Sequence, residues 1–393
     1  MLRIGMLTSG GDCQALNAAM RGVVKGLFQA RKDVEIYGFE EGYKGLIYSN
    51  FRMLKAEDFS GILTVGGTIL GTSRQPFKLM RVPDENGLDK VEAMKHTYHK
   101  LSLDCLVILG GNGTHKTANM LREEGLNVVT LPKTIDNDLA VTDHTPGFGS
   151  AAKFIAATMK EIIRDGLVYD YPTVTIVEIM GRNAGWLTAA SALARGEDCE
   201  GVDLIYLPEK VFDIDHFLER VKEIASKGRS MVIAVSEGIK VMDGRYVFEL
   251  SDHVEFVDAF GHKQLAGSAK FLANKVGSEL GIKTRAIELS TLQRCAAHMT
   301  SRTDITEAFN VGGAAVKAAF EGETGKVVVL KRVSDDPYMC ITETHDVHQI
   351  ANIEKKVPLE WITEDDFVTE DLIHYIRPLI QAELSPIMVD GLP

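Results

Sequence analysis

An apolar strand, a glycine-rich turn and an amphipathic helix follow one another twice in the first third of the chain, and this recurrence limits the folds open to it. The first copy runs from the strand Arg3–Leu7 through Gly10-Gly11 to a helix that ends near Ala30. The second runs from the strand Leu103–Leu109 through Gly110–Thr114 to a helix that ends near Glu124. Strands and helices that alternate in this way predict a parallel sheet covered by helices on both faces.

Glycine turns at strand ends are suited to phosphate, because the helix that follows offers free backbone N–H groups. A third glycine cluster, Gly66–Ser73, ends at Arg74, whose planar guanidinium can bind phosphate bidentately. A plain tight turn explains any one of these clusters alone. Three of them favour several phosphates bound along one edge of a sheet. The sequence has no G-x-x-x-x-G-K-[ST] run, so it is not a P-loop protein.

The acidic stretch Thr134-Ile135-Asp136-Asn137-Asp138 follows another apolar run, Asn127–Leu131. Open α/β sheets bind their ligands beyond the carboxyl ends of the strands, which is where this stretch falls. Of two carboxylates so close together, one can hold a cation while the other accepts a proton, because each changes the other's environment. The alternative is a polar turn that caps the next helix.

The second half of the chain repeats the alternation and predicts another doubly wound lobe. A long helix opens at Phe148-Gly149-Ser150, and strands are predicted at Val174–Met180, Leu204–Leu207, Ser230–Val235, Leu289–Gln293 and Val327–Leu330. Charged residues stand near the ends of several of these strands: Arg182, Glu209, Glu237, Arg285 and Arg294. A final helix is predicted over Asp371–Leu384.

Composition excludes some classes of partner. A net charge of −12 argues against nucleic acid or an anionic membrane as the main partner. The length of 393 residues favours two lobes over one core. The five cysteines are scattered without C-x-x-C spacing, which is typical of a reducing compartment and of no zinc site. With no signal-peptide or membrane-span pattern, we expect a cytoplasmic protein.

These residues, taken in order, resemble the phosphofructokinase family up to about residue 320. The T-I-D-N-D signature of the family stands at Thr134–Asp138 and its M-G-R at Met180–Arg182; the remaining matches are Ser9–Asp12, Gly67-Thr68 with Arg74, and Leu292–Arg294. The resemblance implies an α/β fold of two doubly wound, Rossmann-like lobes with the active site in the cleft between them, in a homodimer or homotetramer. We expect a phosphoryl-donor lobe of residues 1–148 and about 293–345, and a sugar-phosphate lobe of about 149–292 and 346–393.

The resemblance also implies transfer of a phosphoryl group from ATP to the C1 hydroxyl of fructose 6-phosphate, a step of glycolysis, with Mg²⁺ as cofactor. Asp136 would be the general base. The other catalytic residues would be Thr134, Asp138, Gly11 and Arg182, and the metal ligands Asn112 and Asp138. The donor-binding residues would be Gly11, Arg74, Gly111, Asn112, Gly113, Thr114 and Lys133. The substrate-binding residues would be Thr134, Asp136, Met180, Gly181, Arg182, Glu237, Arg285, Thr291 and Arg294, with Arg285 acting within its own chain or from a neighbouring subunit.

Two positions bear on the phosphoryl donor. Family members with Gly at the position of Gly113 have room for a nucleotide, whereas Asp there favours pyrophosphate. Lys133 stands where typical bacterial ATP enzymes have Gly and pyrophosphate enzymes have Lys. The combination resembles an ATP-using branch close to the pyrophosphate enzymes. We therefore expect ATP, with pyrophosphate as the alternative.

Other positions depart from the family pattern. Asn112 replaces a metal-associated Asp and loses a negative charge for Mg²⁺. Thr291 replaces a substrate-binding His, and Cys13-Gln14-Ala15 replaces C-P-G. These changes leave open another acceptor sugar phosphate, or a non-catalytic regulatory subunit that binds a sugar phosphate. The presence of Asp136 and Asp138 argues for catalysis, because a pure binder needs no base.

Structural explanations also stay open for single residues. Met180 can be a core residue, and Glu237 and Arg182 can form an ion pair across two strand ends. Like the other lone arginines, Arg74 can be a solvated surface charge. His115 and His144 lie close to the site in sequence but lack metal-ligand spacing, so we expect both to be hydrogen-bonded bystanders.

Overall fold

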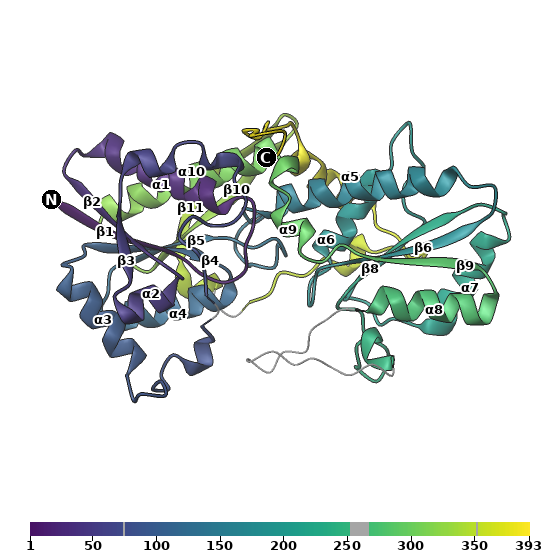
Figure 1. Cartoon of the computed structure of the whole chain (residues 1–393), viewed down its shortest axis with the longest axis horizontal. Coiled ribbons are helices and arrows are strands. Elements are labelled where there is room, and N and C mark those ends of the chain that lie inside the picture. The colour runs from purple at the N-terminus through teal and green to yellow at the C-terminus, as the bar shows by residue number, and fades with distance from the viewer. Residues whose placement is uncertain (74, 252–266, 351–352) are drawn as a thin grey trace.

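Two α/β lobes lie side by side along the long axis of the computed structural model (Figure 1). The structure describes residues 1–73, 75–251, 267–350 and 353–393. Within these ranges one lobe contains a seven-stranded sheet and the other a four-stranded sheet. The two-lobed Rossmann-like fold predicted from the sequence is confirmed.

The larger sheet has the strand order β11-β10-β5-β4-β1-β2-β3. Its central strands are parallel, and the strands at its two edges, β3 and β11, are antiparallel to their neighbours. The strands are β1 (Leu2–Thr8), β2 (Val34–Phe39), β3 (Phe51–Leu54), β4 (Cys105–Gly110), β5 (Val128–Pro132), β10 (Lys326–Asp335) and β11 (Tyr338–Asp346).

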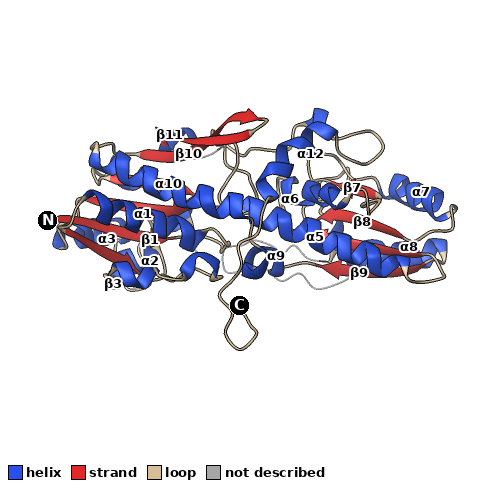
Figure 2. Ribbon diagram, turned by 90° about the horizontal axis from the view of Figure 1, so that it is seen from above, coloured by secondary structure: helices blue, strands red, loops and turns tan. Residues whose placement is uncertain are grey.

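Helices cover both faces of this sheet (Figures 1 and 2). One face carries α1 (Leu16–Ala30) and α10 (Arg302–Phe320), which pack along each other. The other face carries α2 (Tyr43–Tyr48), α3 (Lys90–Lys100) and α4 (Asn112–Glu123). A short helix, α11 (Val347–Ile350), packs on α4.

The smaller sheet is entirely parallel and has the order β7-β8-β6-β9. Its strands are β6 (Thr173–Ile179), β7 (Leu204–Tyr206), β8 (Met231–Ser236) and β9 (Lys283–Glu288). One face carries α5 (Phe148–Leu167) and α6 (Trp186–Ala189), and the other carries α7 (Ile214–Ala225) and α8 (Ser268–Leu280). The short helices α9 (Leu292–Cys295) and α12 (Glu370–Ile376) complete the described part of the chain.

Alternating side chains of the buried strands divide between two cores. In β4, Val107 and Leu109 join the core under α1 and α10, whereas Leu106 and Ile108 join the core under α2, α3 and α4. This division follows from the two-residue period of a strand, and it explains why a sheet covered on both faces needs unbroken apolar runs. The first of these cores continues into the smaller lobe through Phe148 and Val177, so the two lobes share one hydrophobic cluster.

Three sequence predictions in the last third of the chain are wrong in detail. Leu289–Gln293 is not a strand: the strand is Lys283–Glu288, and the chain turns at Ser290 before α9 begins at Leu292. The strand predicted at Val327–Leu330 extends through Lys326–Asp335 and pairs with β11, which was missed. The predicted last helix ends at Ile376, and Arg377–Ile380 is a 3-10 turn that contains Pro378.

The carboxyl ends of the parallel strands of both sheets point toward the middle of the molecule (Figure 1). The polar residues that follow β1, β4 and β5 in one lobe therefore face those that follow β6 and β8 in the other. This is the position at which open parallel sheets bind ligands.

Candidate active site

One buried lysine joins two strand ends of the larger lobe. The Lys133 ammonium group donates a hydrogen bond to the carbonyl of Gly11, and the backbone N–H of Lys133 donates to Gly110 O at 3.0 Å. A Cβ on Gly10 would lie 3.7 Å from Lys133 Nζ and 3.8 Å from Thr114 Oγ1. Burial lowers the pKa of Lys133. The glycine turns after β1 and β4 therefore meet at the beginning of the acidic stretch.

The third glycine cluster is fastened to the same turn. Thr72 Oγ1 donates to Gly10 O at 2.7 Å, and the Asn17 amide donates to Val65 O and Gly67 O at 2.9 and 2.8 Å. Arg74, which was predicted to bind the donor, lies outside the described residues. Its neighbours up to Ser73 run beside the first glycine turn.

The turn after β4 leads directly into α4. Asn112 is the first residue of this helix, and a Cβ on Gly111 would lie 3.6 Å from Lys133 O. A Cβ on Gly113 would meet nothing within 4 Å in the described structure, so the space in front of this residue is open. Thr114 is buried, and its carbonyl accepts a hydrogen bond from Tyr43 Oη at 2.9 Å.

The two histidines near the site in sequence differ in their surroundings. His115 is fully buried, and burial lowers its pKa to about 3, although its interaction with the backbone of Gly110 acts in the opposite direction. His144 is hydrogen-bonded on both sides, by Asp143 Oδ1 at 2.7 Å and Glu307 Oε2 at 2.6 Å. Burial alone would lower the pKa of His144, but these two carboxylates keep it raised.

Asp136 is partly buried among positive charges. Burial raises the pKa of its carboxyl group, while Lys133, Arg182 and Arg294 act in the opposite direction. Its backbone N–H donates to Thr134 Oγ1 at 3.1 Å. The three cations come from β5, from the loop after β6 and from α9, so both lobes contribute to the surroundings of this carboxylate.

Asp138 lies in a group of crowded carboxylates. Burial, together with the charges of Asp136 and Glu354, raises the pKa of Asp138 to about 7. Carboxylate and amide oxygens are the ligands that Mg²⁺ prefers, and a divalent cation would relieve the repulsion that raises this pKa. The side-chain oxygens of Asp138 and Asn112, the two predicted ligands, are therefore of the kind that suits Mg²⁺.

In the smaller lobe, Met180, Gly181 and Arg182 follow β6. The backbone N–H of Gly181, whose φ is +142°, donates to Glu237 Oε1 at 3.3 Å, and Gly181 O accepts from Ser236 Oγ at 2.6 Å. Met180 is partly buried against the core, and its N–H donates to Gln293 Oε1 at 3.3 Å. Burial raises the pKa of Glu237 to about 8, and the charges of Asp136 and Glu178 add to this rise.

Helix α9 brings Arg294 to the first glycine turn. A Cβ on Gly11 would lie 3.8 Å from Arg294 Nη1, and the Gln14 amide donates to Gln293 O at 3.3 Å. Thr291 lies just before this helix and is exposed.

Two other sequence-selected residues lie apart from the site. Arg285 is on β9 and half exposed, and it forms an ion pair with Asp165 at 2.8 Å. It precedes Glu288, the end of its strand, by three residues or about 10 Å. Glu209 is used structurally: its Oε1 accepts N–H groups of Gly185 at 2.9 Å and Val357 at 3.0 Å.

Sequence reasoning missed Lys355 and Tyr375, which contact the acidic stretch from the C-terminal part of the chain. Tyr375 Oη accepts from the Asn137 amide at 3.0 Å, and the Lys355 N–H donates to Asp138 O at 2.7 Å. Burial lowers the pKa of Lys355 to about 8. No local pattern marks either residue. Lys355 lies in a segment without a periodic pattern, and Tyr375 lies on the last helix, α12, where its position gives no sign of a contact with the acidic stretch.

Comparison with known proteins places the chain in a family. The phosphofructokinase family profile matches residues 3–319. The chain is 39% identical over 335 residues to an ATP-dependent 6-phosphofructokinase of Spirochaeta thermophila, covering 83% of this chain and 87% of that protein. It is 36% identical over 399 residues to a pyrophosphate–fructose 6-phosphate 1-phosphotransferase of Xanthomonas campestris, covering 98% and 93%.

Solved structures agree with this placement. A pyrophosphate-dependent phosphofructokinase from Nitrosospira multiformis superposes with a TM-score of 0.87 at 28% identity, covering 100% of this chain and 95% of that one. The two lobes, with polar residues at the strand ends between them, thus have the architecture of a sugar-phosphate phosphotransferase. The chain belongs to the phosphofructokinase family, and its relatives include enzymes of both donor types.

Proposed function

We propose that the protein transfers the γ-phosphoryl group of ATP to the C1 hydroxyl of fructose 6-phosphate, giving fructose 1,6-bisphosphate and ADP. The observation that carries this proposal is the environment of Asp136, a partly buried carboxylate under the influence of Lys133, Arg182 and Arg294. Phosphoryl transfer depends on positioning and on charge stabilisation more than on covalent chemistry. A base surrounded by cations meets both requirements.

In the proposed reaction, Asp136 accepts the proton of the C1 hydroxyl as its oxygen attacks the γ-phosphorus. The new P–O bond forms while the bond from the γ-phosphorus to the oxygen that ADP retains breaks. Lys133, Arg182 and Arg294 offset the negative charge that is shared among the oxygens in the transition state. Glu237, protonated at neutral pH because its pKa is about 8, donates a hydrogen bond to a sugar hydroxyl.

Mg²⁺ is the proposed cofactor, held by Asp138 and Asn112 beside Asp136. When bound, it supplies positive charge that neutralises and orients the phosphates of the donor. The raised pKa of Asp138, about 7, supports this assignment, because a crowded carboxylate gains most from a cation.

The open space in front of Gly113 favours ATP, since a nucleotide needs room beyond its phosphates. Pyrophosphate is the second candidate donor, and a specific observation favours it: Lys133 is held against Gly11 O, where its ammonium group can serve a compact leaving phosphate.

The arrangement of the whole molecule is also part of the proposal. The lobe of the larger sheet would bind the donor, and the lobe of the smaller sheet the sugar phosphate. We assign the protein to the cytoplasm as a homodimer or homotetramer. All five cysteines are free thiols, which suits a reducing compartment. None of the described helices is long and apolar enough to cross a bilayer.

The proposal is tested by product formation from fructose 6-phosphate and Mg²⁺, with ATP in one tube and pyrophosphate in the other. Turnover with ATP alone supports the proposal, and turnover with pyrophosphate alone contradicts its donor. No turnover with either donor would favour another acceptor sugar phosphate or a non-catalytic subunit that binds a sugar phosphate. Gly113→Asp sharpens the test, because its carboxylate would enter the open space and should raise the KM for ATP at least tenfold. Gly113→Ala, which adds only a Cβ, is the matched control and should retain ATP use.

A further inference from the structure

The tail segment, residues 353–376, returns to the acidic stretch after both sheets are complete. Glu354 forms an antiparallel bridge with Leu139, and the Lys355 N–H donates to Asp138 O at 2.7 Å. On the other side, Lys355 O accepts from Trp186 Nε1 at 2.9 Å. This segment lies outside residues 3–319, where the family profile matches.

The Lys355 ammonium group bonds to several points of the same loop. It donates to the carbonyls of Asp143 and, at 3.2 Å, of Thr142, and to Asn137 Oδ1 at 3.3 Å. It also lies 3.4 Å from Tyr375 Oη, which itself donates to Asp143 O at 2.5 Å. One cation thus ties together the two ends of the loop 137–143.

This loop needs external support because its backbone is strained. Asn137 has φ +53° and the β-branched Val141 has φ +71°, both in the left-handed region. Such a conformation is an outlier for a β-branched residue such as Val141 and persists only where the surroundings hold it, whereas Asn adopts it more readily. The sequence at these two positions does not fix the loop by itself.

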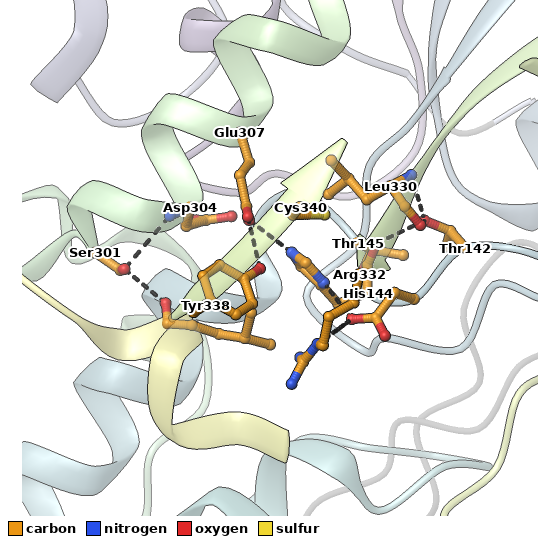
Figure 3. Close-up of polar contacts among 12 residues, drawn as sticks. Thr142, His144, Thr145, Ser301, Asp304, Glu307, Leu330, Arg332, Tyr338 and Cys340 are labelled. Atoms are coloured by element: carbon orange, nitrogen blue, oxygen red, sulfur yellow. Dashed lines mark hydrogen bonds and ion pairs between the residues drawn. The ribbon is translucent and has the colours of Figure 1, made fainter. Parts of the chain in front are cut away.

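The far side of the loop is fastened separately (Figure 3). His144 bonds Glu307 of α10, Thr142 Oγ1 accepts the N–H of Leu330 in β10 at 3.0 Å, and Arg332 pairs with Asp143 at 3.1 Å. These contacts hold residues 142–144. The backbone of Asp138 and the side chain of Asn137 are held from the tail segment, by Lys355 and Tyr375.

We propose that Lys355 is a positioning residue: its backbone and ammonium group together hold the loop 137–143, which contains Asp138 and directly follows Asp136, in the shape that the reaction needs. The residue acts through the loop and touches no reacting atom. This inference rests on the proposed function, since Asp136 serves there as the base.

The test compares Lys355→Met, which keeps the length of the side chain but removes its charge and donors, with Lys356→Met, an exposed neighbour, as matched control. We expect Lys355→Met to lower kcat ten- to a hundredfold, because small misplacements of a reacting group cost that much, and to change the KM for fructose 6-phosphate less than threefold. Lys356→Met should behave as the unchanged protein. A kcat within twofold of the unchanged protein in Lys355→Met would overturn the proposal.

Hydrogen exchange gives a second readout that does not depend on the reaction. The amides of Asp143 and Thr145, which bond Leu330 O at 2.8 Å and Asn137 Oδ1 at 3.1 Å, should exchange faster in Lys355→Met. The amides of β4 should keep their protection, which controls for general unfolding. If the unchanged protein is inactive with both donors, the proposed function fails, while unaltered exchange at Asp143 and Thr145 would separately overturn the positioning role.

Discussion

Burial and neighbouring cations act in opposite directions on Asp136. Burial raises the pKa of this carboxyl group, and Lys133, Arg182 and Arg294 lower it. The balance suits a base that must be ionised before the reaction and must accept a proton during it.

Replacement of Asp136 by Asn keeps the size of the side chain and removes the base. We expect kcat to fall about 10²- to 10⁴-fold, the usual contribution of general base catalysis. The KM for fructose 6-phosphate should change only a few-fold, and the variant should still fold, because Asn keeps the size of the side chain. Steady-state kinetics with calorimetry checks this, and near-full turnover would contradict the assigned role.

Glu237 makes stability depend on pH. Its pKa is about 8 in the folded protein against 4.5 as a reference, so between these values the folded chain binds a proton that the unfolded chain has lost. The free energy of unfolding therefore falls as pH rises through this window. In Glu237→Gln this loss is absent.

Melting temperatures measured from pH 4.5 to 8 should separate the two proteins. We expect the melting temperature of Glu237→Gln to exceed that of the unchanged protein by an amount that grows with pH and reaches a few degrees at pH 8. The KM for fructose 6-phosphate of this variant should increase. The difference in melting temperature should shrink toward pH 4.5, where the unfolded state is about half protonated, and vanish below it, where both states of the unchanged protein are protonated. A difference that is the same at every pH would show that the carboxyl group does not titrate as described.

At this scale the sequence located most of the residues that meet in the structure. Gly11, Lys133, Asp136, Arg182 and Glu237 follow strand ends, and parallel strands bring their ends together. Arg294 joins them from α9, not from the strand that the sequence predicted there. Lys355 could not be located in this way. Its ammonium group binds backbone carbonyls, and any residue provides a carbonyl, so no pairing of side chains in the sequence points to it.

At the scale of elements, α1 and α10 approach each other through glycines. A Cβ on Gly312 of α10 would collide with the carbonyl of Ala19, and one on Gly22 of α1 with the carbonyl of Phe309. The close approach of these helices therefore requires the absence of side chains at both positions.

Gly312→Ala should destabilise the protein by roughly 1–3 kcal/mol, the usual cost of overpacking, because helix backbones would have to move apart. Gly313→Ala is the matched control: the next residue of the same helix has no atom within 4 Å of an added Cβ in the described structure. Because Ala favours a helix over Gly, this variant should be as stable as the unchanged protein or up to about 1 kcal/mol more stable. Denaturant titration measures both, and equal effects would refute the close approach.

The elements that the sequence predicted correctly are those with buried periodic patterns. The error near residue 290 has a physical cause: β9 lies at an edge of its sheet and carries the polar residues Lys283 and Arg285, so it lacks the apolar run by which buried strands are identified. The next apolar residues, Leu289 and Leu292, belong to the turn and to α9. The last helix is shorter than predicted because Pro378, which has no backbone N–H, cannot continue it.

At the scale of the whole molecule, Arg285 connects the question of the site with that of the assembly. Within its own chain it pairs with Asp165 at the surface, three residues before the carboxyl end of its strand. We propose that it binds the sugar phosphate of a neighbouring subunit.

Sedimentation should therefore find a homodimer or homotetramer, and Arg285→Ala should raise the KM for fructose 6-phosphate about tenfold, since a charged hydrogen-bond partner of the phosphate is lost. Its melting temperature should barely change, because an exposed ion pair contributes little. Arg31→Ala, which breaks an exposed pair with Asp33 in the other lobe, serves as control. A monomer, or an unchanged KM, would remove Arg285 from the site.

The contact of the tail segment with the acidic stretch also affects the order in which the protein is synthesised and folds. Lys355 and Tyr375 follow every described strand of both sheets, so a ribosome makes them only after the rest of the architecture has been translated. The same late residues also complete the shared core, since Val357, Leu372 and Ile376 are buried in it. A chain that ends before residue 355 would therefore lack both the contacts to the acidic stretch and part of the core beside it.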